Sequence, residues 1–249
     1  MKDLKNAFPY APVTFHNKIN QTLNKLIEEE AHQNMKKHKL FSKKILVLVA
    51  AAILVIGTGV FAAGKITTYV SSSSNIPTYT SVPSDKELQH KYGFAPNVVD
   101  TFTNGYQFAG IYTDNNKGLD EDGKTVKESK DVTIDYKNGK ESIMLSAQAR
   151  AIDDDTDMAT VDTYKGTAIQ YSAYDNKCVP PDYKFTEQDK QDEKSGKYVF
   201  SCGTDKVEIS KVQSLTWYQN GITYIFTGID SPLSKGDLVT MAHEVMDTK

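Results

Sequence analysis

The chain has 249 residues, enough for one or two domains, and its mean hydropathy of −0.47 is that of a soluble protein. The formal net charge of −3 gives no reason to expect direct nucleic-acid binding, and the five histidines show no metal-binding spacing. These averages conceal a division of the chain, because an uncharged segment separates a basic N-terminal part from an acidic remainder.

Residues 1–44 are expected to form a cytoplasmic arm. They carry nine lysines and four acidic residues, a net charge of +5, whereas the rest of the chain has a net charge of −8. Several lysines directly precede the uncharged segment: Lys36, Lys37, Lys39, Lys43 and Lys44. The positive-inside rule therefore places the N-terminus in the cytoplasm.

An amphipathic helix is predicted within this arm, over residues 15–39, with Thr14 as its N-cap. Its apolar residues recur at helical spacing and form one narrow stripe: Phe15, Ile19, Leu23, Leu26 and Ile27. So narrow a stripe cannot form a core by itself, and three consecutive glutamates, 28–30, oppose membrane contact. We expect a cytoplasmic protein to bind Phe15, Ile19, Leu23 and Leu26, the alternative being a weakly ordered anchor.

Residues 45–64 are predicted to be a transmembrane helix in contact with the lipid bilayer. The nineteen residues from Ile45 to Ala63 carry no charge, and a helix of this length spans roughly 28 Å, close to the thickness of a bilayer core. A cleaved signal peptide is the alternative, because Phe61-Ala62-Ala63-Gly64 offers small residues for cleavage. The 44 residues that precede the segment favour an uncleaved span.

Residues 65–84 are predicted to be a serine-rich flexible linker, followed by an extracytoplasmic domain over residues 85–249. Ser84 marks the start of a short helix. Alternating residues predict strands at 106–112, 132–136, 142–150, 167–174 and 197–202, with a tight turn at Asn138-Gly139. The polar stretches 114–130 and 179–196 are expected to be exposed loops.

The clearest local pattern lies near the C-terminus. Residues 215–219 and 222–226 alternate around Asn220-Gly221, which predicts a hairpin with a type I′ turn. Ser234 and Asp237 then begin a helix with an apolar face formed by Leu238, Met241, Ala242 and Val245. A helix of this kind packs on an antiparallel sheet, so the predicted fold class of the exterior domain is α+β.

No catalytic, metal-binding or cofactor-binding constellation is found, and we expect that the chain is not an enzyme. His243 lacks partner ligands for a metal ion. The acidic stretch 120–123 fails as an EF-hand at both ends of the loop, and the stretch 153–157 lacks the required glycine. Weak cation binding by the second stretch is the alternative to a solvated loop.

The two cysteines, Cys178 and Cys202, both fall in the predicted exterior part. An oxidising exterior permits a disulfide between them, and we expect one. Two free thiols are the alternative.

Two segments resemble a known family. The first combines Phe8-Pro9-Tyr10-Ala11-Pro12, the arm helix and its lysine cluster, and the span that ends at Gly64. The second is the hairpin pattern Trp217-x-x-x-Gly221-x-x-Tyr224, followed by the C-terminal helix. Together they resemble the anti-sigma-factor-like single-pass membrane proteins of Gram-positive bacteria, which carry an extracytoplasmic domain of unknown function.

The resemblance covers roughly the first 64 and last 40 residues, and the arm lacks the His-x-x-x-Cys-x-x-Cys pattern of zinc-binding anti-sigma factors. It implies that the arm helix holds a sigma factor while the exterior domain senses the state of the envelope. The alternative is a cell-surface binding module for a glycan, peptide or cation, in which the arm is only an anchor. The identity of the exterior ligand does not follow from the sequence.

Overall fold

The computed structural model describes residues 50–55, 68–74, 76–120, 124–149, 158–180 and 182–248. The chain divides into two compact units. The first unit comprises Met1–Ile76 and Thr113–Lys130, and the second comprises Pro77–Tyr112 and Asp131–Lys249. Strands β3 (Gln107–Leu119) and β4 (Thr125–Asn138) contribute residues to both units.

The described part of the first unit is a small antiparallel sheet. Strand β1 (Ala50–Val55) pairs with β2 (Thr68–Ser73), and β2 pairs with the distal half of β3. The predicted loop at 114–130 is therefore wrong over most of its length, because these polar residues extend β3 and β4. Backbone pairing with β2 supplies hydrogen bonds that the polar composition gave no reason to expect.

The predicted transmembrane helix and the predicted linker both differ from the structure of this unit. Ala50–Val55 lies within the predicted transmembrane segment and is a strand, while the other residues of 45–64 lie outside the described residues. An uninterrupted apolar run is compatible with either a strand or a helix, and periodicity does not distinguish them. The predicted flexible linker contains β2, whose threonine, tyrosine and valine residues favour strands. Among the described residues, no helix has the length and hydrophobicity needed to cross a bilayer.

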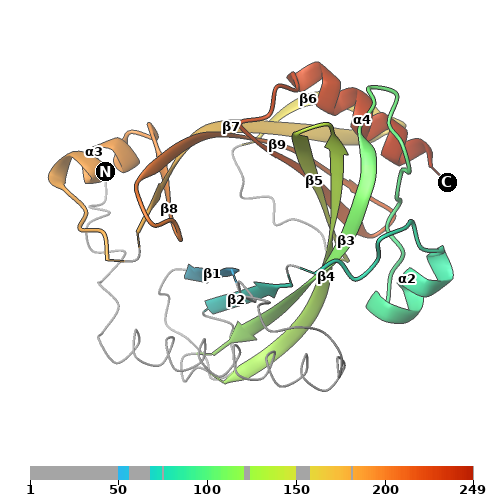
Figure 1. Cartoon of the computed structure of the whole chain (residues 1–249), viewed down its shortest axis with the longest axis horizontal. Coiled ribbons are helices and arrows are strands. Elements are labelled where there is room, and N and C mark those ends of the chain that lie inside the picture. Colours follow the sequence, from blue (N-terminus) through green and yellow to red (C-terminus); the bar gives the residue numbers. More distant parts are fainter. Residues whose placement is uncertain are drawn as a thin grey trace. The chain divides into compact units, whose positions relative to one another are not determined.

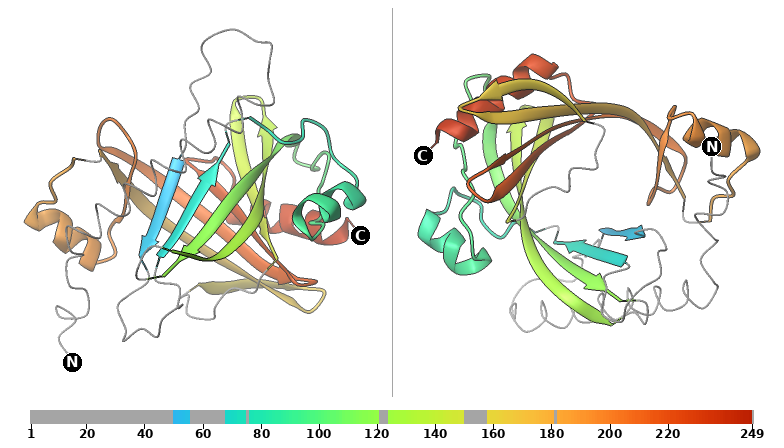
Figure 2. Two further views of the ribbon diagram at one scale, coloured as in Figure 1. Left: turned by 90° about the horizontal axis from the view of Figure 1, so that it is seen from below. Right: turned by 180° about the vertical axis from the view of Figure 1, so that it is seen from behind.

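The second unit is mostly β, and Figures 1 and 2 show its long twisted strands. Its strands follow the order β3-β4-β5-β10-β9-β7-β6, with β8 beside β7. These further strands are β5 (Glu141–Gln148), β6 (Ala159–Tyr164), β7 (Thr167–Val179), β8 (Val199–Cys202), β9 (Glu208–Gln219) and β10 (Ile222–Ile229). The pairings among β4, β5, β10, β9, β7 and β6 are antiparallel, whereas β8 is parallel to β7.

Both predicted hairpins are present. The turn predicted at Asn138-Gly139 lies one residue later, because Asn138 still pairs with Glu141 and the chain turns at Gly139, with a φ of 61°, and Lys140. Asn220 and Gly221 join β9 to β10 with φ values of 53° and 82°, as a type I′ turn requires.

The helices begin where the capping residues predict. Helix α2 (Asp85–Tyr92) starts after Ser84, and α4 (Lys235–Asp247) starts after Ser234. In each case the capping serine and the acidic residue three positions later bond each other's backbone N–H groups. The buried face of α4 contains the four predicted residues together with Met246. The prediction of a sheet with a C-terminal helix packed on it is confirmed for this unit.

The core lies between α4 and the sheet. Trp217 of β9 stacks on Tyr224 of β10, with their ring centroids 5.1 Å apart, beneath the apolar face of α4. The buried Asn97 joins the segment after α2 to this core. Its backbone N–H donates to the Tyr224 hydroxyl at 2.9 Å, and its side-chain Nδ2 donates to the Val245 carbonyl at 2.8 Å. Burial raises the pKa of Tyr224 to about 12, so this hydroxyl stays neutral at physiological pH.

Replacing the buried Leu238 of α4 by alanine is expected to lower the free energy of unfolding by about 2–5 kcal/mol, because it leaves a cavity beneath the helix. Urea denaturation of the full-length protein in detergent measures this, with the fluorescence of Trp217, the single tryptophan, as the probe. The control Ile229→Ala alters a side chain that is 53% exposed and is expected to change stability by less than about 0.5 kcal/mol. Equal effects of the two substitutions would contradict the packing of α4.

Candidate functional site

The stretch predicted as an exposed loop, 179–196, contains a helix, α3 (Glu187–Lys194), and the prediction is wrong there. Thr186 caps α3, and Asp189 completes a capping box. The buried residues of α3 are two acidic ones, Asp189 and Asp192, in place of the usual apolar face. Polar contacts of these carboxylates therefore take the place of apolar packing in fixing the helix to β7 and to the turn that follows it.

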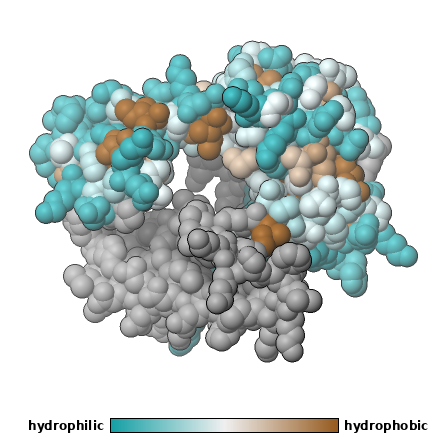
Figure 3. Space-filling model, in the orientation of Figure 1, coloured by the Kyte–Doolittle hydropathy of each residue, from teal (hydrophilic) through white to brown (hydrophobic). Residues whose placement is uncertain are grey.

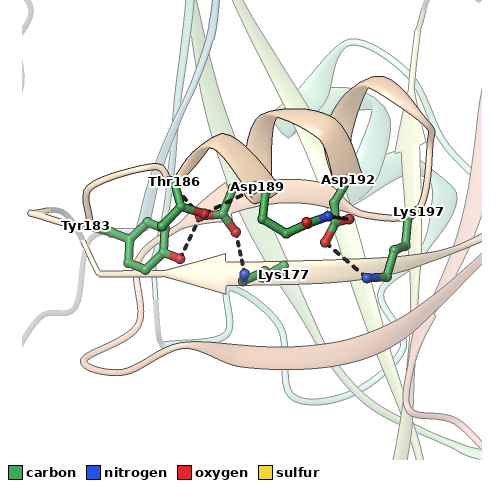
Figure 4. Close-up of polar contacts among 7 residues, drawn as sticks. Lys177, Tyr183, Thr186, Asp189, Asp192 and Lys197 are labelled. Atoms are coloured by element: carbon green, nitrogen blue, oxygen red, sulfur yellow. Dashed lines mark hydrogen bonds and ion pairs between the residues drawn. The ribbon is translucent and has the colours of Figure 1, made fainter.

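Asp189 is the main anchor of α3. Its carboxylate accepts hydrogen bonds from Lys177 Nζ at 2.5 Å, Thr186 Oγ1 at 2.7 Å and the Tyr183 hydroxyl at 2.9 Å. Figure 4 shows Lys177 reaching from β7 to the start of α3 to make this contact. The Lys177 ammonium is the largest of several causes that hold the pKa of Asp189 well below its usual range.

Aromatic rings surround the same lysine. Lys177 Nζ lies 5.4 Å from the centroid of Phe200 and 5.8 Å from those of Tyr183 and Tyr198. These cation–π contacts stabilise an ammonium that its neighbours partly remove from water.

We call the region formed by α3, β8 and the end of β7 the α3 lobe. Figure 3 shows hydrophobic groups on its surface, where Phe185 and Val199 are 45% and 46% exposed.

The second buried carboxylate of α3 fixes the turn that follows the helix. Asp192 accepts from Gln188 Nε2 at 2.7 Å and from Lys197 Nζ at 3.0 Å. These two hydrogen bonds, the Gln188 bond being the larger effect, lower the pKa of Asp192. Figure 4 shows the contact of Lys197 with Asp192, which holds Lys197 just beyond the end of α3.

A groove of about 480 Å³ opens on β7 and β9, and we call it the β7–β9 groove. Ala173 and Asp175 of β7 form its floor with Lys211 and Gln213 of β9. One wall is the turn at Gly196 and Lys197, and the other is the loop before α4, with Ser231 and Leu233. Figure 1 shows α3 and α4 at opposite ends of β7, which is how these two walls arise.

Gln213 makes the floor rigid. Its Nε2 donates to the Leu233 carbonyl at 2.8 Å, and its Oε1 accepts from the Tyr171 hydroxyl at 3.3 Å. Asp230 fixes the same loop, because its carboxylate accepts from the backbone N–H of Lys211 at 2.8 Å. One wall is thus bonded directly to the floor.

Two opposite charges lie side by side on this floor. Asp175 and Lys211 are directly paired in the β7–β9 register, so both side chains point to the same face. Within the described part of the chain, neither side chain has a hydrogen-bond or ion-pair partner. The floor of the groove therefore presents a hydrogen-bond acceptor, the Asp175 carboxylate, next to a donor, the Lys211 ammonium.

The structure places the half-buried His243 on the side of α4 that faces β6, and it does not line the groove. Its Nε2 lies 2.6 Å from Asp162 Oδ2. Its ring stacks on that of Tyr164, with the two ring centroids 3.9 Å apart. The hydrogen bond from His243 lowers the pKa of Asp162. These contacts fix α4 to the β6–β7 hairpin, which gives His243 a packing role. Among the described residues, no group of three or more His, Cys, Asp or Glu side chains could hold a metal ion.

The predicted disulfide is absent, since Cys178 and Cys202 are both free thiols. In the β7–β8 register Cys178 lies opposite Ser201, and Cys202 lies opposite Val179. Neighbouring residues of a strand point to opposite faces, so the two thiols lie on different faces of the sheet. A disulfide requires Cβ atoms roughly 4 Å apart, which this register does not provide. A hydrogen bond from Ser201 is the largest cause of a lowered pKa at the Cys178 thiol.

The partner-binding stripe of Phe15, Ile19, Leu23 and Leu26 lies outside the described residues, as do the acidic residues 121–123 and 153–157. The groove itself was not predicted from the sequence. The only local sign of the α3 lobe was the spacing of Thr186 and Asp189, which matches a capping box.

Comparison of the chain with protein-family models, with curated proteins and with solved structures finds no match.

The α3 lobe is expected to loosen in acid. Because Asp189 has a lowered pKa in the folded chain, its contribution to stability is complete above the unfolded pKa of about 3.9 and is lost as the pH falls further. Hydrogen exchange of residues 187–194, corrected for the intrinsic effect of pH, should therefore rise below about pH 4.

Asp189→Asn is expected to raise this exchange at neutral pH and to flatten its pH dependence. Glu193→Gln, at an exposed position of the same helix, serves as the matched control and should behave as the native chain. A native-like pH profile in Asp189→Asn would show that the Lys177–Asp189 contact does not hold α3.

Proposed function

We propose that this chain is a membrane-anchored regulator of the anti-sigma type, whose arm binds a cytoplasmic partner and whose exterior domain senses envelope state. The observation that carries the proposal is the stripe of Phe15, Ile19, Leu23 and Leu26. It is too narrow for a core of its own, and it precedes a nineteen-residue uncharged run. The resemblance to anti-sigma-factor-like proteins makes a sigma factor the first partner to test.

The proposal includes a transmembrane helix at residues 45–64, with the N-terminus in the cytoplasm. In lipid, backbone N–H and C=O groups must be satisfied within the segment, and a helix does this without a partner strand. This arrangement differs from strand β1, so the proposal rests on the length of the uncharged run and on the five preceding lysines.

The partner is tested by precipitating the full-length protein from its native membranes. A sigma factor is expected in the precipitate, and Leu23→Glu is expected to release it and to change expression of the genes it controls. Asn24→Glu adds the same charge at the neighbouring polar position and should leave binding intact. Recovery of no sigma factor, with expression unchanged by Leu23→Glu, would refute the anti-sigma role.

Topology is tested with a maleimide that does not cross membranes. In intact cells the reagent should label Cys202, which is exposed in the structure. With both native cysteines replaced by serine, a Ser42→Cys variant should be labelled only after the cells are permeabilised. Labelling of Ser42→Cys in intact cells would place the arm outside and contradict the proposal.

A second candidate function is a surface binding module in which the arm is only an anchor. The β7–β9 groove favours it, because a rigid concave site can serve binding without any signal to the cytoplasm. Replacing residues 1–44 with an unrelated basic anchor separates the two functions. The module keeps its function after this replacement, whereas the regulator loses it.

A further inference from the structure

The β7–β9 groove has the size and rigidity of a ligand site. Its volume of about 480 Å³ falls within the range of small-molecule sites, about 300–1,000 Å³. Gln213 bonds both the Leu233 carbonyl and the Tyr171 hydroxyl, so the floor and one wall are ordered before a ligand enters. Preorganisation of this kind lowers the entropic cost of binding.

The charges of the groove nearly cancel. Lys197 on the wall is neutralised by Asp192, and Lys211 on the floor faces the opposite charge of Asp175. An anionic ligand would be attracted by Lys211 and repelled by the Asp175 carboxylate. A cationic ligand would be attracted by Asp175 and repelled by Lys211. A neutral ligand with both donor and acceptor groups suits this floor better than a charged one.

Asp175 and Lys211 on the floor indicate which donor and acceptor groups the ligand carries. The Asp175 carboxylate accepts hydrogen bonds, and the Lys211 ammonium donates them, from adjacent positions on one face. One hydroxyl group of a sugar ring can donate to Asp175 while a neighbouring hydroxyl accepts from Lys211. Hydrogen bonds to charged groups are stronger than those between neutral groups, which helps to replace the water lost by the ligand.

The remaining lining offers apolar contact. Ala173 lies between the charged pair and the half-buried Tyr171, and Leu233 lies on the wall beside them. A sugar ring presents C–H groups on its faces and hydroxyls around its edge. Lys235 Nζ already lies over the Tyr171 ring, 5.8 Å from its centroid, so a sugar face would contact Ala173 and Leu233 while its edge reaches Asp175 and Lys211.

We propose that the β7–β9 groove binds a neutral oligosaccharide, with Asp175 accepting from one sugar hydroxyl and Lys211 donating to its neighbour. This inference deepens the proposed sensing role and rests on it only for the exterior location of the groove. The ligand class would be a hydroxyl-rich uncharged glycan of the cell surface or its surroundings.

The test uses the purified full-length protein in detergent and isothermal titration calorimetry. Three neutral tetrasaccharides serve as probes, built from glucose, mannose and N-acetylglucosamine units. A tetramer of galacturonic acid is the charged counterpart. At least one neutral probe is expected to bind, and to bind more tightly than the acidic tetramer.

Lys211→Met and Asp175→Leu are each expected to weaken this binding about tenfold or more, because each leaves a sugar hydroxyl without its charged partner. Among the described residues, neither side chain has a hydrogen-bond or ion-pair partner, so the fold should survive, as Trp217 fluorescence would verify. Lys86→Met, at an exposed position on α2, is the matched control and should bind as the native chain does.

Three results would overturn the proposal: no binding of any neutral probe, tighter binding of the acidic tetramer, or unchanged binding in both groove variants. None of these bears on the cytoplasmic partner, because the assay contains only the purified chain and a saccharide. Conversely, loss of the sigma-factor interaction in Leu23→Glu would leave saccharide binding intact. The two proposals can therefore fail separately.

Discussion

The two-residue alternation of side chains along β9 is the constraint on which the rest of the second unit depends. One face of this strand carries Lys211 and Gln213 in the groove, and then Leu215 and Trp217 beneath α4. The core and the groove are thus successive parts of a single sheet face. A slip of one residue would move Trp217 out of the core and Lys211 out of the groove together. The burial of Trp217 therefore also sets the register of the groove.

The walls of the groove are held by different kinds of interaction. Helix α4 is fixed by apolar burial and by the bonds of Asn97, whereas α3 is fixed by its two buried carboxylates. Breaking a buried charge pair on one side leaves an uncompensated charge, so the Lys177–Asp189 contact specifies the position of α3 strongly. It also makes this wall sensitive to acid, because the lowered pKa of Asp189 depends on that contact.

The parts of the fold that follow from local patterns were predictable. The capping boxes at Ser84 and Ser234 and the turn at Asn220 rely on residues within a few positions of one another. The groove depends on the pairing of Asp175 with Lys211, which are distant in the sequence, and no local pattern contains that register. The β7–β8 register is likewise not contained in a local pattern. It places Cys202 one residue beyond the partner of Cys178, so the two thiols lie on opposite faces of the sheet.

We propose that one chain joins a cytoplasmic binding helix to an exterior ligand site. Lysines lie in both parts, for example Lys18 and Lys25 in the arm and Lys211 in the groove. Crosslinking through lysine, followed by mass spectrometry on the full-length protein in its native membrane, identifies the neighbours of each part. We expect Lys18 and Lys25 to be linked to a cytoplasmic protein and Lys211 to be linked only to exterior components. Links from the arm to exterior proteins, or from Lys211 to cytoplasmic ones, would contradict it.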